Sequence, residues 1–392
     1  MKLRSPITDA ELQRRWTEVA TAMKDQDIDA LVMQNTSDWV GGYVRWFSDI
    51  PACNGYPRTL IFYRDQPMTI IEMGAFDVVK DLAGKDEIHR GVGRVVHTPS
   101  FTSIGYTNTY DAALLVAELQ RTKPAKIGWL TPQALPFSLI DCVQNMPDRP
   151  ELVDATDQVD TIKAIKSAEE IELIHRTAQL QDKVFAEVCD FLRPGVTDID
   201  VANHAQAAAH RLGSDQGIFL GTSAPLGRSS RFAGRAFQGR TIEKGDHFSL
   251  LIEVNGPGGV YLEIARTMVL GTASDHLLQA FDHVHKAQDH TLSLMQPGAD
   301  PASIAASHDA WMRDHDLPPE TRLYAHGQGV DMVERPMIRS DETMPLARDM
   351  CFAVHPGFDD GKVFAVICDN YMIEADGPGA CLHKTDKKIF QL

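Results

Sequence analysis

The sequence lacks any pair of cysteines in the C-x-x-C spacing that is typical of zinc sites and redox motifs. Its six cysteines are scattered over 392 residues, and free thiols are the default expectation for such a chain. No apolar run approaches the length needed to span a bilayer, and the first residues contain no apolar segment typical of a secretory signal. These absences predict a cytoplasmic protein without a disulfide framework or a membrane anchor.

Positive charge is also scarce, because 38 Lys and Arg residues stand against 54 Asp and Glu residues and leave a net charge of −16. Such a surface repels phosphate backbones and anionic lipids, so neither nucleic acid nor a membrane is expected as a partner. The hydrophobic content of 43% and the charged content of 23% are ordinary for a globular protein. A chain of this length can form two domains with separate cores, and we expect its partner to be a small-molecule substrate.

Residues 1–158 alternate between helical and strand patterns. Thr8 or Asp9 can cap a first helix, and a second helical pattern covers residues 110–122. Short apolar segments predict strands at residues 30–33, 59–63, 68–73, 126–130 and 151–154. This alternation predicts an α/β domain with a mainly parallel sheet.

Residues 159–392 form the second predicted domain. Ser167 followed by Glu170 is a capping box, which predicts the start of a long helix over residues 168–192. The segments at residues 191–202 and 294–305 align without a gap, each with Pro-Gly between two helical patterns. This recurrence predicts an internally duplicated domain made of two similar halves.

Five polar residues stand out on the strand-rich segments of this domain: Glu253, Glu263, His326, His355 and Cys368. The two glutamates are flanked by apolar residues on predicted strands, where a carboxylate without a role is expensive to bury. The two histidines have a side chain whose pKa near neutrality suits proton transfer. We therefore expect these five segments to converge on a functional site.

In this order and spacing the segments resemble the five metal-binding segments of the pita-bread hydrolases, which include methionine and proline aminopeptidases, prolidases and creatinase. Further matches are I-K-S-A-E-E-I-E at residues 165–172, E-K-G-D at residues 243–246 and H-G-Q-G at residues 326–329. The resemblance implies an α+β pita-bread domain with internal duplication, preceded by the α/β domain of prolidase, aminopeptidase P and creatinase. It also implies a homodimer, in which the partner subunit's first domain closes the active site.

The residues at the family's ligand positions depart from its usual set of Asp, Asp, His, Glu and Glu. Glu253 and Glu263 replace the two aspartates. His355 and Cys368 replace the two glutamates, and only His326 is retained. The family's four carboxylates balance two divalent cations, whereas two glutamates remain here. A dinuclear metal centre is therefore not expected.

Three functions stay open, and we favour creatinase-like hydrolysis of a C–N bond in a small charged nitrogenous metabolite, without a metal or other cofactor. His326 or His355 then shuttles protons, and Cys368 becomes a nucleophile if His355 lowers its pKa. In the second function, Glu263, His326, His355 and Cys368 hold a single zinc or iron ion for a peptidase-like hydrolysis or a lyase reaction. In the third, the cleft binds a ligand without turnover.

Further residues are predicted to bind the substrate or to orient the site. Arg231 lies in an arginine-rich segment at residues 221–240, which can clamp a substrate carboxylate. A cluster in the first domain suits a quaternary ammonium or amidinium group, and its members are Trp39, Tyr43, Trp46 and Arg58. The remaining predictions are Asp331 and Glu334 for substrate binding, and Asp369 and Arg266 for orienting their neighbours.

Overall fold

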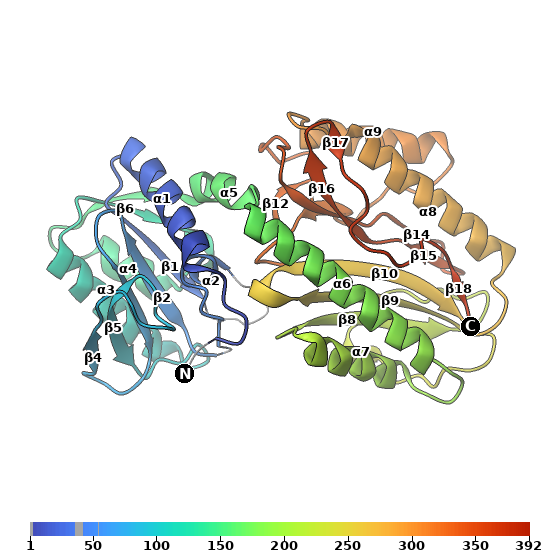
Figure 1. The fold of residues 1–392 in the computed structure, drawn as a ribbon, viewed down its shortest axis with the longest axis horizontal. Coiled ribbons are helices and arrows are strands. Elements are labelled where there is room, and N and C mark those ends of the chain that lie inside the picture. Colours follow the sequence, from blue (N-terminus) through green and yellow to red (C-terminus); the bar gives the residue numbers. More distant parts are fainter. Residues whose placement is uncertain (1–2, 36–41, 54) are drawn as a thin grey trace. The chain divides into compact units, whose positions relative to one another are not determined.

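The computed structural model describes residues 3–35, 42–53 and 55–392. The chain divides into two compact units, Met1–Lys163 and Ala164–Leu392 (Figure 1). From the sequence, the boundary was expected between residues 158 and 159. All six cysteines are free thiols, as expected. Among the described residues, no helix combines the length and the apolar character that crossing a bilayer requires.

The first unit is built on a seven-stranded sheet with its strands in the order β4-β5-β3-β2-β1-β6-β7. The strands are β1 (Ala30–Asn35), β2 (Arg58–Tyr63), β3 (Met68–Met73), β4 (Val79–Asp81), β5 (Val92–Thr98), β6 (Lys126–Trp129) and β7 (Glu151–Asp154). The helices are α1 (Asp9–Asp25), α2 (Gly42–Ser48), α3 (Asn108–Thr122), α4 (Phe137–Gln144) and α5 (Thr156–Ala164), with the 3-10 turns η1 (Gly105–Thr107) and η2 (Pro132–Ala134). All five predicted strands and both predicted helices are present.

The sheet of the first unit is mixed, so the prediction of a mainly parallel sheet was wrong. The pairs β1–β6, β6–β7 and β3–β5 are parallel, whereas β1–β2, β2–β3 and β4–β5 are antiparallel. Only residues 64–67 join β2 to β3, and a connection this short forms a hairpin rather than a crossover. Strand β5 was missed, because Gly93 and Arg94 interrupt its apolar pattern.

Helices α3 and α4 close the core of this unit over one face of the sheet. Leu115 and Leu119 of α3 and Leu139 of α4 share a buried cluster with Val32 and Ile61 of the sheet. Burying an aliphatic side chain of this size stabilises the fold by roughly 1.5–3 kcal/mol. The spacing of the leucines on α3 is therefore what attaches the helix to the strands.

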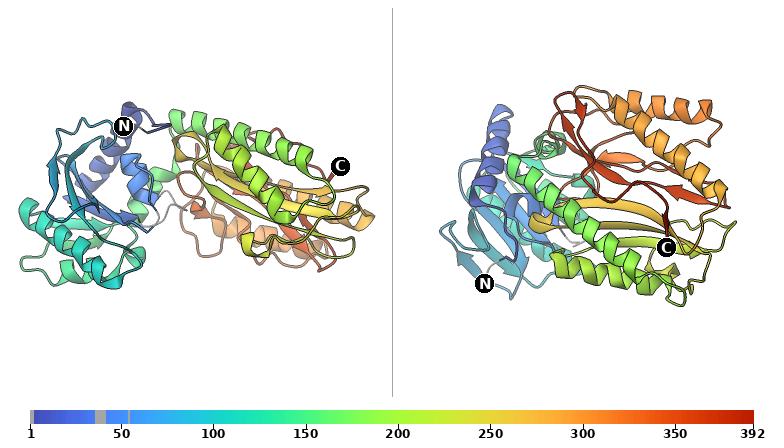
Figure 2. Two further views of the ribbon diagram at one scale, coloured as in Figure 1. Left: turned by 90° about the horizontal axis from the view of Figure 1, so that it is seen from below. Right: turned by 45° about the vertical axis from the view of Figure 1, so that its right-hand side comes forward.

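The second unit contains two helix pairs and two main sheets (Figures 1 and 2). The helices are α6 (Ala168–Phe191), α7 (Asp198–Leu212), α8 (Asp275–Leu294) and α9 (Pro301–Asp314), with the 3-10 turns η3 (Arg235–Phe237) and η4 (Pro257–Gly259). One sheet contains, in order, β18 (Phe390–Gln391), β10 (Tyr261–Val269), β9 (His247–Asn255) and β8 (Gly217–Ala224). The other contains β12 (Glu334–Met337), β11 (Ala325–Gly327), β13 (Cys351–Val354), β16 (Asp369–Glu374) and β17 (Gly377–Pro378), and β14 (Gly357–Asp359) and β15 (Phe364–Val366) form a separate hairpin.

The link between the two helices of each pair repeats the same local geometry. Gly195 and Gly298 follow α6 and α8 with φ values of 94° and 86°, a conformation that glycine adopts without strain. Gly195 N donates a hydrogen bond to Ile242 O at 2.9 Å, and Gly298 N donates one to Leu346 O at 2.7 Å. The predicted capping box of Ser167 is present at the start of α6. The two helix pairs are thus linked by the same backbone conformation and the same type of hydrogen bond, which agrees with the predicted internal duplication.

The two main sheets of the second unit meet along β10 and the segment that leads into β16. Ala265 N donates to Cys368 O at 3.2 Å, and Cys368 N donates to Ala265 O at 3.4 Å. Strand β16 pairs with β13, which pairs with β11. This continuity brings side chains of β9 and β10 next to side chains of β11 and β13, although the strands are far apart in the sequence.

The turn that follows β12 depends on one buried carboxylate. Glu342 accepts hydrogen bonds from Arg335 at 2.6 Å and from the backbone N–H groups of Met337, Thr343 and Met344 at 2.8–3.1 Å. Burial opposes the charge of Glu342, but these donors outweigh it and lower its pKa from 4.5 to about 2. Because the folded-state pKa is depressed, the stabilisation is complete above pH 4.5 and is lost as the pH falls toward 2.

We expect Glu342→Gln to lower the free energy of unfolding at pH 7 by about 2 kcal/mol, after allowance for partial screening by solvent. Chemical denaturation at a series of pH values should show this difference shrinking as the pH falls below that of an ordinary carboxyl group. Asp341→Asn is the control, because its ion pair with Arg339 lies in the same turn but is exposed. A difference that does not change with pH would contradict the assignment.

Candidate active site

Two glutamates face each other across the antiparallel strands β9 and β10. Glu253 and Glu263 occupy directly opposite positions in the register, so both side chains project from the same face of the sheet. Both residues are buried, with exposed fractions of 6% and 4%. Two carboxylates that share a buried site do not both ionise readily, so the protonation states of the pair are coupled.

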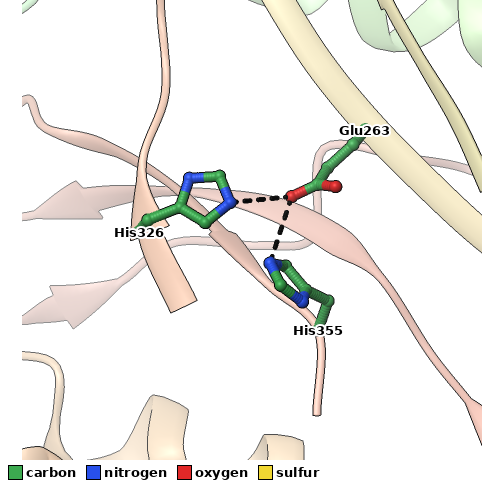
Figure 3. A group of neighbouring side chains, drawn as sticks. All are labelled: Glu263, His326 and His355. Atoms are coloured by element: carbon green, nitrogen blue, oxygen red, sulfur yellow. Dashed lines mark ion pairs between the residues drawn. The ribbon is translucent and has the colours of Figure 1, made fainter. Parts of the chain in front are cut away.

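Two histidines from the other sheet reach Glu263 (Figure 3). His326 lies on β11, and His355 directly follows β13. Glu263 Oε1 lies 3.2 Å from His326 Nε2 and 3.4 Å from His355 Nε2. The two imidazole rings meet edge to face, with their centroids 5.2 Å apart. The structure therefore brings together three of the predicted site residues, which we call the Glu263–His326–His355 cluster.

The groups of the cluster differ in charge. Burial and repulsion from Glu263 raise the pKa of Glu253 well above its usual value, which favours its neutral form. Burial also opposes the charge of Glu263, but His355 and His326 outweigh it and lower the pKa of Glu263 to about 2. Burial lowers the pKa of His355 to about 4. At His326, the contact with Glu263 outweighs burial and raises the pKa.

Gln328 and Asn370 orient the two glutamates and were not predicted. Asn370 Oδ1 accepts a hydrogen bond from Glu263 N at 2.9 Å, and Asn370 Nδ2 donates to Gln328 Oε1 at 2.7 Å. Gln328 Nε2 then donates to Glu253 Oε1 at 3.1 Å. Gln328 is the third residue of H-G-Q-G and Asn370 ends I-C-D-N, so both were in segments of interest. Only the spatial arrangement indicates their role.

Cys368 lies beside the cluster, but its sulfur is engaged elsewhere. The Sγ atom donates to the carbonyl oxygen of Glu263 at 3.6 Å, and the side chain packs in an apolar cluster with Leu251, Phe364 and Val366. Burial and the nearby carboxylates raise the pKa of the thiol well above its usual value. The predicted nucleophile needed a pKa lowered by His355. That condition is not met, because burial dominates.

We expect Cys368→Ala to keep kcat/KM within about tenfold of the unsubstituted protein, because a buried neutral thiol is a poor nucleophile. Removing the buried sulfur should cost stability of about 1 kcal/mol. Steady-state kinetics and a thermal melt of the variant measure both effects. Loss of turnover with an unchanged melt would instead identify the sulfur as part of the reaction.

Arg266 and Asp369 form an ion pair behind the cluster. The Nη2–Oδ1 distance is 2.6 Å, and both side chains have an exposed fraction of 0%. Arg266 Nη1 also donates to the carbonyl oxygens of Ala265 and Cys368 at 2.9 and 3.0 Å, at the place where the two sheets join. This placement fits the predicted role of both residues in orienting their neighbours, and the role itself stays a prediction.

Glu334 holds the loop that follows His326. Its Oε2 lies 2.6 Å from Lys166 Nζ, and both side chains have an exposed fraction of 4%. Its Oε1 accepts a hydrogen bond from Asp331 N at 3.0 Å. The carboxylate of Glu334 is therefore buried against an ammonium group, which disfavours contact with a ligand, and its substrate-binding role stays a prediction. The substrate contact of the Asp331 side chain stays a prediction.

Trp46 and Arg58, which were predicted to bind a cationic group of the substrate, lie in the first unit. Trp46 has an exposed fraction of 1%, and its ring packs edge to face against Phe47 with centroids 5.1 Å apart. Burial of the ring disfavours a substrate contact, which stays a prediction. Arg58 Nε forms an ion pair with Glu72 Oε2 at 2.8 Å, and its contact with a substrate stays a prediction. Trp39 lies outside the described residues.

A cavity of about 480 Å³ lies near the backbone of His355, and the three side chains of the cluster are not part of its lining. Gly357 of its lining is two residues beyond His355, and Arg322 of its lining donates from Nη2 to His355 O at 3.2 Å. Arg231 also lines the cavity and forms an ion pair with Asp359 at 3.0 Å. The structure thus places the predicted substrate ligand Arg231 at a cavity next to His355.

The usual dinuclear centre of the pita-bread hydrolases does not fit these side chains. Two divalent cations carry four positive charges, whereas the five residues at the family's ligand positions include two carboxylates, Glu253 and Glu263. Glu253 accepts a hydrogen bond from Gln328, and the Cys368 thiol is directed at the backbone. The donor set therefore lacks the charge that two bridged ions require.

The sequence matches proteins of the family that its segments resemble. Residues 172–375, just over half of the chain, match metallopeptidase family M24. The chain is 29% identical over 245 residues to the uncharacterized peptidase YqhT of Bacillus subtilis, and the match covers 61% of this chain and 68% of YqhT. It is 30% identical over 202 residues to creatinase of a Bacillus species, and that match covers 48% of this chain and 47% of creatinase.

Similarity of fold extends over nearly the whole chain. X-Pro aminopeptidase from Thermotoga maritima matches with a TM-score of 0.77 and covers 96% of this chain and 99% of that chain. The identity is 16%, so this likeness concerns the fold alone. It confirms the predicted architecture of an α/β unit followed by a pita-bread unit. The chain therefore belongs to metallopeptidase family M24 and is a hydrolase of the pita-bread fold.

Proposed function

We propose that this protein hydrolyses a C–N bond in a small nitrogen-containing metabolite or dipeptide at the Glu263–His326–His355 cluster. The observation that carries the proposal is the meeting of Glu263 Oε1, His326 Nε2 and His355 Nε2 in a buried cluster. Hydrolysis requires groups that hold a water molecule and take a proton from it as it attacks. The family supplies the reaction class, and the relatives include both peptidases and creatinase.

The three side chains are suited to binding and activating water. Glu263 is ionised, and His355 is neutral near pH 7, so both can accept a hydrogen bond from water or a proton. Burial of the cluster strengthens these interactions, because a water-poor site screens charge less. A divalent ion, when bound by the same three residues, would lower the pKa of the water it holds.

The cavity beside His355 favours a zwitterionic substrate. Arg231 and Arg322 present guanidinium groups that can bind a carboxylate in a bidentate manner. Each arginine is paired with an acid that also lines the cavity, Arg231 with Asp359 at 3.0 Å and Arg322 with Glu320 at 2.9 Å. Charges of both signs therefore line one small cavity. An amino-acid derivative or a short peptide carries the complementary pair.

The proposal is tested by a turnover screen in water enriched in the isotope ¹⁸O. The panel contains Xaa-Pro dipeptides, amidines, guanidines and betaines, and mass spectrometry follows the products. We expect release of an amine, ammonia or urea, with one labelled oxygen in a product. Cys368→Ala should behave like the unsubstituted protein, whereas Glu263→Gln should turn over at least about a hundredfold more slowly.

Two results would overturn the proposal. Cleavage without incorporation of labelled oxygen would identify an elimination, and the protein would be a lyase of this fold. A compound that raises the melting temperature but is never converted would identify a binding protein, because a ligand stabilises the folded state whether or not it reacts.

A further inference from the structure

We propose that Glu263, His326 and His355 hold one divalent cation of the zinc or iron(II) class. The inference deepens the proposed function, on which the catalytic purpose of the ion rests. It departs from the dinuclear centre of the pita-bread hydrolases in the number of ions. It also departs in the donors, which are two ring nitrogens and one carboxylate oxygen.

The first argument is the orientation of the His326 ring. Its Nδ1 atom lies 2.9 Å from the carbonyl oxygen of Gly327. A carbonyl oxygen only accepts, so Nδ1 carries a hydrogen, and Nε2 is the ring atom that a metal can bind when the ring is neutral. Nε2 lies 3.2 Å from Glu263 Oε1, so either a proton or a cation must lie between these two atoms. Histidines that bind a metal commonly donate their second ring N–H to a backbone carbonyl in this way.

The second argument is a pair of unsatisfied polar atoms. Glu263 Oε1 and His355 Nε2 are buried, and neither has a hydrogen-bond partner within the part of the chain that the structure describes. Buried polar atoms in native proteins are nearly always paired. Glu263 Oε1 faces Nε2 of both histidine rings (Figure 3). A cation between the three atoms would satisfy all of them.

The third argument is distance. Glu263 Oε1 lies 3.2 and 3.4 Å from the two ring nitrogens, and the three ligand atoms all lie within 4.8 Å of one another. Zinc binds nitrogen and carboxylate oxygen at about 2.0–2.2 Å in tetrahedral sites, which places neighbouring ligand atoms about 3.3 Å apart. The observed separations are therefore those of side chains that share one ion.

The donor atoms select the class of metal. Two imidazole nitrogens and one carboxylate suit zinc or iron(II) and leave positions open for water or substrate. Calcium and magnesium prefer oxygen ligands throughout. One carboxylate leaves one positive charge on a divalent ion uncompensated, which favours hydroxide or a substrate carboxylate at an open position.

A second group of potential ligands provides an internal control. Asp369, Cys381 and His383 also have ligand atoms within 4.8 Å of one another. The guanidinium group of Arg266 lies 2.6 Å from Asp369 Oδ1, so it already neutralises this carboxylate and repels a cation. We therefore assign no ion to this second group.

The test is metal analysis of protein purified without added metal, followed by chelation and reloading with Co(II) as a spectroscopic probe. We expect about one ion per chain and visible absorption bands of Co(II) with nitrogen and oxygen ligands. His355→Ala and His355→Gln should each lose the bands, whereas Cys381→Ser should keep them. Reloading with zinc should raise the melting temperature of the unsubstituted protein, because the ion binds only the folded site.

The possible results separate this inference from the proposed function. Protein that turns over substrate but holds no ion as purified and gives no Co(II) bands after loading would overturn the inference and leave the function standing. Two ions per chain, or Co(II) bands lost in Cys381→Ser but kept in the His355 variants, would also overturn it. One bound ion without turnover would contradict the function alone. Melting curves of the metal-free variants establish that each one is folded.

Discussion

Replacing Glu263 by glutamine is expected to lower kcat/KM by about 10²–10⁴-fold, the range that positioned acid–base groups contribute. The substitution keeps the size of the side chain, but it removes the ionised carboxylate that both histidines approach at 3.2 and 3.4 Å. An amide cannot take a proton from water, and it binds a divalent ion weakly. Because the shape is retained, the melting temperature should stay close to that of the unsubstituted protein.

Glu253→Gln is the matched control, since Glu253 lies directly opposite Glu263 in the register and is equally buried. Burial and the charge of Glu263 raise the pKa of Glu253 and favour its neutral form, which an amide resembles in charge. The hydrogen bond from Gln328 can still end on the side-chain oxygen. We expect a loss of less than about tenfold in kcat/KM. A loss as large as that of Glu263→Gln would show that Glu253 itself exchanges a proton during the reaction.

Asp369→Asn is expected to lower the free energy of unfolding by about 3–5 kcal/mol, the cost of leaving one member of a buried ion pair uncompensated. Arg266 and Asp369 are both fully buried, and their contact is 2.6 Å long. The other Arg266 donors end on backbone carbonyls, including those of Ala265 and Cys368. With asparagine at position 369, no carboxylate among the described residues is in contact with the buried guanidinium group of Arg266 to balance its charge. The effect should be measured by chemical denaturation.

An exposed ion pair of similar length provides the control for this prediction. Lys286 Nζ and Asp282 Oδ2 lie 2.7 Å apart on α8, with side-chain exposed fractions of 60% and 57%. Asp282→Asn should change stability by less than about 1 kcal/mol, because water screens exposed charges. Equal stability of the two variants would mean that the Arg266–Asp369 pair contributes nothing beyond an ordinary surface contact.

Much of the fold was predictable because its signals are local. The capping box of Ser167 marks the start of α6 through contacts between residues three apart. The glycines at 195 and 298 follow helices because their backbone conformation disfavours other residues. The direction of the strands in the first sheet was not predictable in the same way. Only the short connection between β2 and β3 decides that they form a hairpin.

The members of the candidate site were predictable, but their roles were not. Motif order indicated Glu263, His326 and His355, and the structure brings them together. It leaves Trp46 in the core under Arg15 and Glu334 against the buried Lys166, and both of these partners lie far away in the sequence. No local pattern contains that information.

By itself, the sequence determined the family, the two-unit organisation and the loss of the carboxylates that a pair of ions needs, because these depend on residue identity and order. Tertiary structure alone decided which glutamate is ionised, which nitrogen of His326 faces Glu263 and where the sulfur of Cys368 is directed. The physical reason is that pKa values, ring tautomers and hydrogen bonds depend on neighbours brought close by the pairing of distant strands.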